Sequence, residues 1–599
     1  MALSHHGMKR KPLAVSFGFL AAVALVAASV LALRRPAPAL ATPAAAIDDA
    51  TVSFLVRFGV HDAAPRAWDG SVAVESGALL ALRNWHPRPG DRVETDRWTL
   101  ATRRGPNFQR RAWEEEPSEA PLAYTLTPGI VVDCKTSAAT RARFATGNGN
   151  FDLRPQELEA GKRATFLDGA VVVERVPAAG VLSAAESQND APAALALPGG
   201  EVWVAWLAYR DGQNQVVARR LSGGNWGAVT PVSERPGDVF AVRSARDRQG
   251  RPWFVWSAQV GGNWDLYGRC LRSEGWSQVE RLTDDPQPDI YHALATDSNG
   301  NLWLVWQGFR NGKSDIFARR YDGAAWSPAE RVSSSGVNDW EPAIAADGRG
   351  RVHVAWDTYD KGNYDVVVRT WEGGRWSDIA AVASTPKFEA HVSLACDGAD
   401  RLWAAWSESG MQWGKDSGFL VKKEATRLYQ WRTIQLAVRS GDAWLEAGEV
   451  ERSLPEELRG YNDQPQLVAD GAGRVWLLFR HRTLRIRDTH SNAPAHRAAW
   501  EIFATTAEGE GWRTPVPIAF SQGRQDLPAG AAPDSHGKLW LAWATDNRDF
   551  EEFLFSRAEV RAARFPLPAA AGAAPRLRPR SAPELRTFPV HASEAADLA

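Results

Sequence analysis

A pair of aromatic residues three positions apart recurs along most of the chain. The first member of the pair recurs every fifty residues, with His353 standing in for it once, at Trp203, Trp253, Trp303, His353 and Trp403. The second member follows at Trp206, Trp256, Trp306, Trp356 and Trp406. Two degenerate copies come later, Trp476 with Phe479 and Trp540 with Trp543, which makes seven units. A repeat of this length indicates a propeller or a solenoid.

Each unit is predicted to contain four short β-strands. Around Trp303, apolar residues 293–295 precede a turn at 297–300, and strands are expected at 302–306, 315–319 and 330–333. Residues three apart in a strand point to opposite sides, so the paired aromatics require burial on both faces of the strand. Sheets wedged between two neighbours meet this requirement, which favours a propeller.

We therefore expect an all-β protein with a seven-bladed β-propeller, or a six-bladed one if one copy belongs elsewhere. The last unit has strands expected near 526–532, 538–543 and 551–560, and no fourth strand follows. We predict that residues 180–183, which precede the first unit, supply this outer strand and so close the ring and remove an open sheet edge.

The chain divides into four predicted segments. Residues 1–47 hold a basic stretch and an apolar run at 13–33, which indicates a signal peptide or membrane anchor with its linker. Residues 48–177 show alternating strands without the repeat and are expected to form a β-sandwich. Residues 178–565 hold the propeller, and the Pro/Ala-rich residues 566–599 are expected to be disordered. The protein is expected outside the cytoplasmic membrane, as a periplasmic, secreted or anchored protein, touching membrane only through its N-terminal segment.

Composition narrows the range of partners. The formal net charge is −1, so no strong field attracts nucleic acid. The chain has 28 Trp and only 9 Tyr, consistent with an architecture that repeatedly buries an indole. The three scattered cysteines, Cys134, Cys270 and Cys396, form neither a disulfide framework nor a zinc motif. We expect no metal site and no cofactor, and calcium is the one ion kept as a candidate.

An acidic residue stands about 14 positions before the first aromatic of each unit. The set is Asp190, Asp238, Asp289, Asp339, Glu389, Asp463 and Asp526. Just before the innermost strands, these side chains are predicted to line one mouth of the central channel, together with Tyr291, His292, Trp340 and His391. Grouped like charges need water, a cation or a ligand for compensation, which indicates a binding mouth. The alternative is that each acid accepts backbone N–H bonds in the turn before its strand.

Two long insertions break the repeat, at residues 407–432 and 480–499. Both are expected on the face where the innermost strands begin, and long loops on a regular scaffold often carry function. The candidate ligand-binding residues in them are Trp413, Lys415, Arg480 and Arg482. No complete catalytic motif is present, and no pair of carboxylates stands out as a glycosidase pair.

The repeats resemble the sialidase-like, Asp-box type of propeller. Asp297 and Gly300 are three apart rather than two, and the Arg-Ile-Pro motif is missing, so sialidase chemistry is not implied. Phe58-Gly59, the Trp68 segment 68–71, the Phe166 segment 166–169 and the Trp203 segment 203–206 are similar to secreted bacterial proteins in which a sandwich and a Trp-rich propeller precede a PHP-type metal-dependent domain. That domain's His-x-His motif is not found here, so the resemblance implies an accessory part without its chemistry.

The leading hypothesis is an exported, non-catalytic binding or interaction module that takes an extracellular glycan, a cation or a protein ligand at the acid-lined face. One alternative is a glycoside hydrolase or lyase of sialidase-like propeller type that uses carboxylates on the same face. Another is an accessory scaffold of a larger metallohydrolase.

Overall fold

The computed structural model describes a chain that is built almost entirely from β-strands. The described residues are 50–59, 66–85, 90–103, 129–411, 432–455, 458–460, 462–482, 500–523, 529–546, 558–565 and 574–580. They contain one four-residue helix, α2 (Val450–Ser453), and one 3₁₀ turn, η1 (Pro155–Glu157). Within this part of the chain no helix is both long and apolar enough to cross a membrane, and the apolar run at 13–33 lies outside it.

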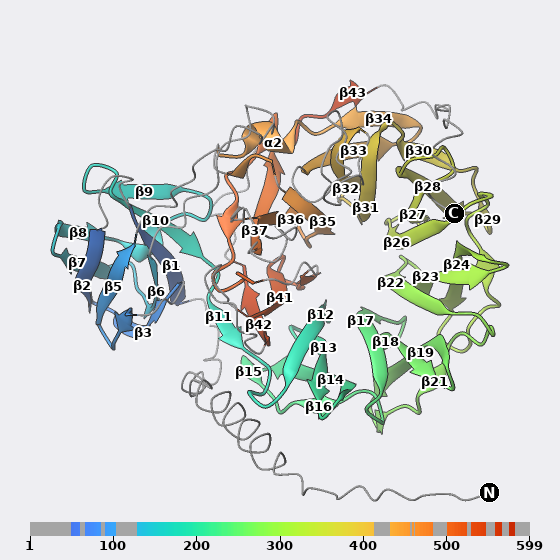
Figure 1. Cartoon of the computed structure of the whole chain (residues 1–599), viewed down its shortest axis with the longest axis horizontal. Coiled ribbons are helices and arrows are strands. Elements are labelled where there is room, and N and C mark those ends of the chain that lie inside the picture. Colours follow the sequence, from blue (N-terminus) through green and yellow to red (C-terminus); the bar gives the residue numbers. More distant parts are fainter. Residues whose placement is uncertain are drawn as a thin grey trace, which may run out of the picture. The chain divides into compact units, whose positions relative to one another are not determined.

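The N-terminal region forms two five-stranded antiparallel sheets that share one apolar core (Figure 1). The first sheet runs in the order β3 (Ala78–Asn84), β6 (Gly129–Lys135), β1 (Thr51–Phe58), β10 (Val171–Val176) and β9 (Arg163–Phe166). The second runs β4 (Arg92–Val93), β5 (Arg97–Arg103), β2 (Arg66–Glu75), β7 (Arg141–Thr146) and β8 (Gly149–Leu153). Phe58 of the first sheet stacks on Trp68 and Trp98 of the second, at centroid distances of 4.9 and 5.8 Å.

From Ala179 onward the described residues form seven antiparallel sheets, arranged around a common centre in Figure 1. The innermost strands are β12 (Gln188–Ala196), β17 (Asp238–Arg246), β22 (Asp289–Thr296), β26 (Asp339–Ala346), β31 (Lys387–Cys396), β35 (Asn462–Ala469) and β40 (Gly530–Pro533). The second strands are β13 (Val202–Arg210), β18 (Pro252–Val260), β23 (Leu302–Arg310), β27 (Val352–Thr358), β32 (Leu402–Met411), β36 (Val475–Arg482) and β41 (Leu539–Thr545). This is a propeller-like, all-β arrangement.

The outer parts of the sheets are shorter. The third strands are β14 (Gln213–Ser222), β19 (Asn263–Arg272), β24 (Lys313–Tyr321), β28 (Asp365–Glu372), β33 (Thr433–Ser440), β37 (Trp500–Glu508) and β42 (Glu559–Arg564). The outermost pieces are β15 (Asn225–Trp226), β16 (Thr230–Pro231), β20 (Gly275–Trp276), β21 (Glu280–Arg281), β25 (Glu330–Arg331), β29 (Arg375–Trp376), β30 (Ala380–Ala383), β34 (Ala443–Glu446), β38 (Gly511–Trp512), β39 (Val516–Pro517) and β11 (Ala179–Val181).

The paired aromatics lie where their spacing predicts. In β23, Trp303 packs with Val352 and Val354 of the following sheet, whereas Trp306 packs with Val255 and Leu266 of the preceding one. Both indoles are almost fully buried. The second strand of the sheet is therefore covered on both faces, which stabilises the stacking of successive sheets because each buried aromatic removes a large apolar area from water.

An aspartate fixes the turn before each second strand. Asp297 accepts hydrogen bonds from the backbone N–H groups of Asn299 and Asn301, both at 2.9 Å, and from the indole N–H of Trp303 at 3.0 Å. The same three-way arrangement recurs at Asp247, Asp397, Asp470 and Asp534. The repeating indole thus has a polar as well as an apolar function, because its N–H ties the strand to the turn.

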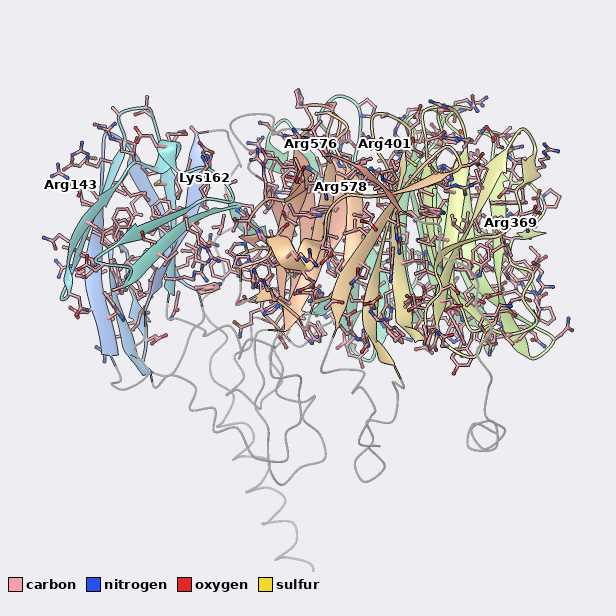
Figure 2. All side chains as sticks on the ribbon, turned by 90° about the horizontal axis from the view of Figure 1, so that it is seen from above. Arg143, Lys162, Arg369, Arg401, Arg576 and Arg578 are labelled. Atoms are coloured by element: carbon pink, nitrogen blue, oxygen red, sulfur yellow. The ribbon has the colours of Figure 1, made fainter. Side chains whose placement is uncertain are left out.

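The predicted contribution of residues 180–183 to the last unit is confirmed. Strand β11 pairs antiparallel with β42, with Gly180 opposite Ala562, and the last sheet has the order β11-β42-β41-β40. Arginines spaced by fifty residues connect neighbouring sheets: Arg269 and Arg369 donate to the outer-strand carbonyls of Val232 and Val332 of the preceding sheet. Arg369 lies at the outer rim of the sheets in Figure 2. Arg219 donates to Leu182 in the same way at 3.0 Å, which links the first of the seven sheets to the last.

Two expectations about the C-terminal part differ from the structure. The third strand of the last unit is Glu559–Arg564 rather than a strand near 551–560, most of which lies outside the described residues. Residues 566–599 were expected to be disordered, yet β43 (Arg578–Arg580) pairs with β34. Arg576 and Arg578, which lie beside the sheets in Figure 2, contact Glu510. An Ala/Pro/Arg composition gave no strand signal, because the pairing depends on partners more than sixty residues away.

Candidate functional site

Each innermost strand of the first six sheets carries a β-bulge at the same place in the repeat. The bulge residue has a positive φ without being glycine, at Ala191 (48°), Ala241 (51°), Tyr291 (38°), Glu341 (47°), His391 (59°) and Gln464 (53°). The register of each strand pair shifts at this point. A left-handed backbone is costly for such residues and persists only where the surroundings hold it. Bulges redirect side chains and are common beside functional sites.

The second strand of the preceding sheet holds each bulge through the residue that follows its second aromatic. Gln307 Oε1 accepts the backbone N–H of Glu341 at 3.3 Å. Asp357 Oδ2 accepts the backbone N–H of His391 at 2.8 Å. The frame therefore needs a hydrogen-bond acceptor at this position, and an uncharged amide is sufficient at Gln307.

Three chemically active side chains meet where β26, β27 and β31 adjoin. Nδ1 of His391 lies 2.9 Å from Oε2 of Glu341. One potential ligand atom from each of Glu341, Asp357 and His391 lies within 4.8 Å of the other two. The Glu341 and His391 side chains are 40 % and 21 % exposed, whereas Asp357 is 2 % exposed. We call these three residues the central cluster.

The electrostatics of the central cluster follow from burial and from the charge of Glu341. Burial disfavours a charged imidazole, but the hydrogen bond to Glu341 and its negative charge outweigh it and raise the pKa of His391 to about 9. Burial, and then the nearby Glu341 carboxylate, raise the pKa of Asp357 to about 8. At neutral pH the cluster thus consists of a Glu341–His391 ion pair above a protonated Asp357.

A second polar group extends the central cluster toward β35. Asp463 forms an ion pair with Arg432 and accepts a hydrogen bond from Ser407 Oγ at 2.6 Å. Burial alone would raise the pKa of Asp463, but the Arg432 guanidinium and then His391 lower it overall. Arg432 also lies over the ring of Phe388, 5.1 Å from its centroid. The guanidinium therefore neutralises Asp463 rather than Glu341.

An aromatic group borders the central cluster. The rings of Trp340 and Tyr364 lie 5.1 Å apart, those of Tyr359 and Tyr364 5.3 Å apart, and Phe388 adjoins Tyr364 at 5.4 Å. Phe388 in turn lies 6.0 Å from the His391 ring. Trp340, Tyr359 and Tyr364 are half-buried, so each keeps part of its surface toward solvent. We call these three residues, with Phe388 beneath them, the aromatic patch.

The acids that the sequence grouped together occupy three different registers. Asp289, Asp339 and Glu389, each 14 residues before the repeat position, are buried. Asp289 accepts from the Trp306 indole and from Arg310, both at 2.9 Å. Glu389 accepts from the backbone N–H and the hydroxyl of Thr385. These three side chains therefore lie inside the sheets rather than along an open mouth, and Glu389 fits the turn-forming alternative.

Burial shifts the pKa of each of these acids upward. The pKa of Asp289 rises to about 6, opposed by Arg310, and that of Glu389 rises to about 7, opposed by the Thr385 hydrogen bonds. The pKa of Asp339 also rises, again through burial. A ligand contact at these residues would need an opening that reaches beneath the surface.

The remaining acids are one residue out of this register. Asp190 and Asp463 stand 13 residues before the repeat position, and each accepts the backbone N–H of the bulge residue that follows it. Asp238 stands 15 residues before it and is exposed at the start of β17. Asp526 lies outside the described residues.

The other predicted residues also separate. Tyr291 is 39 % exposed and packs edge-on against Phe240 at 5.1 Å. His292 is buried with Nε2 2.9 Å from the Val255 carbonyl, and burial lowers its pKa to about 3, so it is a neutral core residue. Arg480 is buried in β36 opposite Asp463. Trp413, Lys415 and the side chain of Arg482 lie outside the described part of the structure.

A cavity of about 230 Å³ lies on the other face of the β26–β30 sheet. Its lining includes Asp339, Thr358, Lys361 and Asp365. Thr358 shares a side of β27 with Trp356, which packs toward the preceding sheet, whereas Asp357 faces β31. The cavity and the central cluster are therefore two separate sites on opposite sides of one sheet.

Sequence reasoning found His391, Trp340 and Asp463 but missed Glu341, Asp357, Arg432, Tyr359, Tyr364 and Phe388. A signal was available for Glu341, because Tyr291, Glu341 and His391 recur at intervals of fifty. No comparable signal marks Asp357, since a residue in a strand buried on both faces gives no indication that its carboxylate meets two side chains from neighbouring strands.

Comparison with known proteins gives likeness of fold only. No protein-family model matches the chain, and no curated protein matches it. A polysaccharide lyase of family PL25, an ulvan lyase bound to -[GlcA(1-4)Rha3S]-, is 12 % identical, with a TM-score of 0.40 over 63 % of this chain and 94 % of that chain. The Hadza microbial sialidase Hz136 is 14 % identical, with a TM-score of 0.37 over 73 % and 92 %. An endo-arabinase from Bacteroides thetaiotaomicron VPI-5482 is 15 % identical, with a TM-score of 0.27 over 39 % and 91 %. At these TM-scores the likeness carries no argument about activity.

Proposed function

We propose that this protein is an exported glycan-binding module whose ligand lies across the aromatic patch and the central cluster. The observation that supports this most directly is the contact of half-buried aromatic rings with a partly exposed Glu341–His391 ion pair. Ligand sites of this kind combine apolar and aromatic walls with a few fixed polar groups. Ring faces suit the C–H surfaces of a sugar, and the carboxylate and imidazolium suit its hydroxyls.

The asymmetry of the repeat also supports a ligand at this place. At the bulge positions of the first two sheets stand Ala191 and Ala241, which offer no chemistry. Glu341 and His391 occupy the same positions two and three sheets later. Symmetric features serve the frame, whereas a ligand site needs different side chains at equivalent places.

The architecture proposed for this module is a closed seven-bladed propeller at 178–565 preceded by a β-sandwich at 48–177. The seven sheets and the β11–β42 pairing support the first part, and the shared core of the two N-terminal sheets supports the second. Export, through the basic and apolar N-terminal segment, is part of the same proposal and rests on the sequence.

The test is a glycan array probed with the full chain and with two variants. Trp340→Ala removes the ring that joins Tyr359 and Tyr364, and we expect the affinity for any bound glycan to fall by roughly tenfold, about 1.4 kcal/mol. Tyr209→Ala removes an exposed aromatic from β13 and serves as the matched control, with unchanged binding expected. Absence of glycan binding by the folded wild-type chain, or equal loss in both variants, would contradict the proposal.

A glycoside hydrolase or lyase is the second candidate, and one geometric observation favours it. Carboxylate oxygens of Glu341 and Asp357 lie within 4.8 Å of each other, near the separation of about 5 Å found in retaining glycosidases. The burial of Asp357 argues against direct contact of that carboxylate with a substrate. Incubating each glycan that the array identifies with the protein, and looking for new reducing ends or unsaturated products, distinguishes the two candidates.

A further inference from the structure

The central cluster has the ligand set of a metal site. It offers one imidazole nitrogen and two carboxylate groups, and one atom from each lies within 4.8 Å of the other two. The three residues come from three strands, β26, β27 and β31, so their separation is fixed by the packing of two sheets. Side chains held on strands are positioned more closely than side chains on loops.

Asp357 carries a buried oxygen that the protein itself does not satisfy. Its Oδ2 accepts the His391 backbone N–H, but its Oδ1 has no hydrogen-bond partner. Such an atom inside a protein costs free energy unless something else compensates it. The carboxylate therefore has unused capacity directed at the same place where Glu341 and His391 meet.

The repeat indicates that this carboxylate is not needed for the frame. At the equivalent place one sheet earlier, the neutral Gln307 accepts the bulge N–H of Glu341. One sheet later, Ser407 occupies the position and bonds to Asp463. The neighbouring sets are thus Tyr291 with Gln307, and Ser407 with Gln464. Among the described sheets, the central cluster alone combines three metal-ligating side chains.

We propose that Glu341, Asp357 and His391 bind one divalent transition-metal ion of the zinc type, with an open coordination position toward solvent. Zinc commonly uses three protein ligands from imidazole and carboxylate groups and keeps a fourth position open. Calcium prefers six to eight oxygen ligands, and the described cluster supplies too few oxygens for it. The partial exposure of Glu341 and His391 provides a route of entry and the open position.

The surrounding charges permit a cation here. Arg432, the cation nearest to the cluster among the interactions of the described residues, forms its ion pair with Asp463. The two carboxylates of the central cluster are therefore left to an ion. This inference is independent of the proposed glycan, because its test contains no glycan and reads metal binding directly.

The experiment is a zinc titration of the full chain after removal of metal with a chelator, followed by isothermal calorimetry at pH 8. Metal ligands bind in their deprotonated forms, which sets the choice of pH. The chain contains 12 His, so weak sites elsewhere are expected, and the informative quantity is the share of binding that variants of the cluster remove. We expect His391→Gln and Glu341→Gln each to weaken the strongest site by at least about tenfold.

The matched control is His536→Gln, which removes an exposed histidine from a turn of the last unit and should leave the strongest site unchanged. Cobalt added in place of zinc should give visible absorption bands that disappear in His391→Gln. If His391→Gln fails to fold, Glu341→Gln, whose side chain is partly exposed, decides the result. Unchanged zinc affinity in a folded cluster variant, or a calcium affinity above that for zinc, would overturn the proposal.

Discussion

Glu341 and His391 stand fifty residues apart in the chain, occupy the same bulge of consecutive innermost strands, and hold Oε2 and Nδ1 2.9 Å from each other. Their contact follows from the repeat, because equivalent positions of stacked sheets become neighbours. It also depends on the bulge, because the positive φ at each residue turns its side chain out of the regular alternation of the strand.

The first prediction concerns the closure of the sheets by β11. Leu182 is 1 % exposed and packs with Trp206 of the first of the seven sheets and Val560 of the last. Replacing it by Ala should lower the free energy of unfolding by about 2–4 kcal/mol, as for other buried leucines. Chemical denaturation measures this loss.

Leu282→Ala provides the matched comparison for this prediction. Leu282 holds the same place in the repeat and is 2 % exposed, so its loss should be similar. Val229→Ala, at an exposed outer position, should change the stability by less than about 0.5 kcal/mol. A Leu182→Ala effect as small as that of Val229→Ala would mean that β11 does not close the last sheet.

The second prediction concerns the aspartate turns. In Asp297→Ala, the indole N–H of Trp303 and the backbone N–H groups of Asn299 and Asn301 lose their common acceptor. Leaving buried donors unsatisfied is expensive, so we expect a loss of about 2–4 kcal/mol in the free energy of unfolding. The exposed Asp322, which accepts from the N–H groups of residues 324 and 325, is the control, and Asp322→Ala should cost less than about 1 kcal/mol. Equal losses would show that the indole contact contributes nothing.

The third prediction concerns Asp365, which lines the cavity in the β26–β30 sheet. Its counterparts Asp265 and Asp315 are paired with Arg281 and Arg331, whereas Ala381 stands at the matching place beside Asp365. Burial raises the pKa of Asp365 from 3.8 to about 6, opposed by hydrogen bonds from Ser384 and Asn363. The folded chain therefore keeps a proton that the unfolded chain releases between about pH 4 and 6.

The sign follows directly. Because the folded state binds the proton more tightly, the contribution of Asp365 to stability falls as the pH rises through this window and stays low above it. The difference in free energy of unfolding between wild type and Asp365→Asn, measured from pH 4 to 7, should shift in favour of the variant by on the order of 2–3 kcal/mol. A difference that is flat with pH would contradict the raised pKa of Asp365.

The sequence alone determined the sheets and their order. Aromatics three apart in a strand cannot both be buried unless the strand is covered on two sides, and fifty-residue units with Gly and Asp turns supply such strands in series. The same reasoning placed residues 180–183 in the last sheet, because every other unit already had its outer strand. These inferences concern local periodicity and the burial of large apolar surfaces, both of which can be read from one chain.

Only the tertiary structure decided which polar side chains meet. Asp190, Asp289 and Asp238 differ by one position in their offset from the repeat, and each one-residue difference turns a side chain to another face of the strand. The bulge changes this alternation once more, which is why Glu341 meets Asp357 and His391 while Glu389, two residues away from His391, is buried against Thr385. Such contacts arise between sheets, where no sequence period records them.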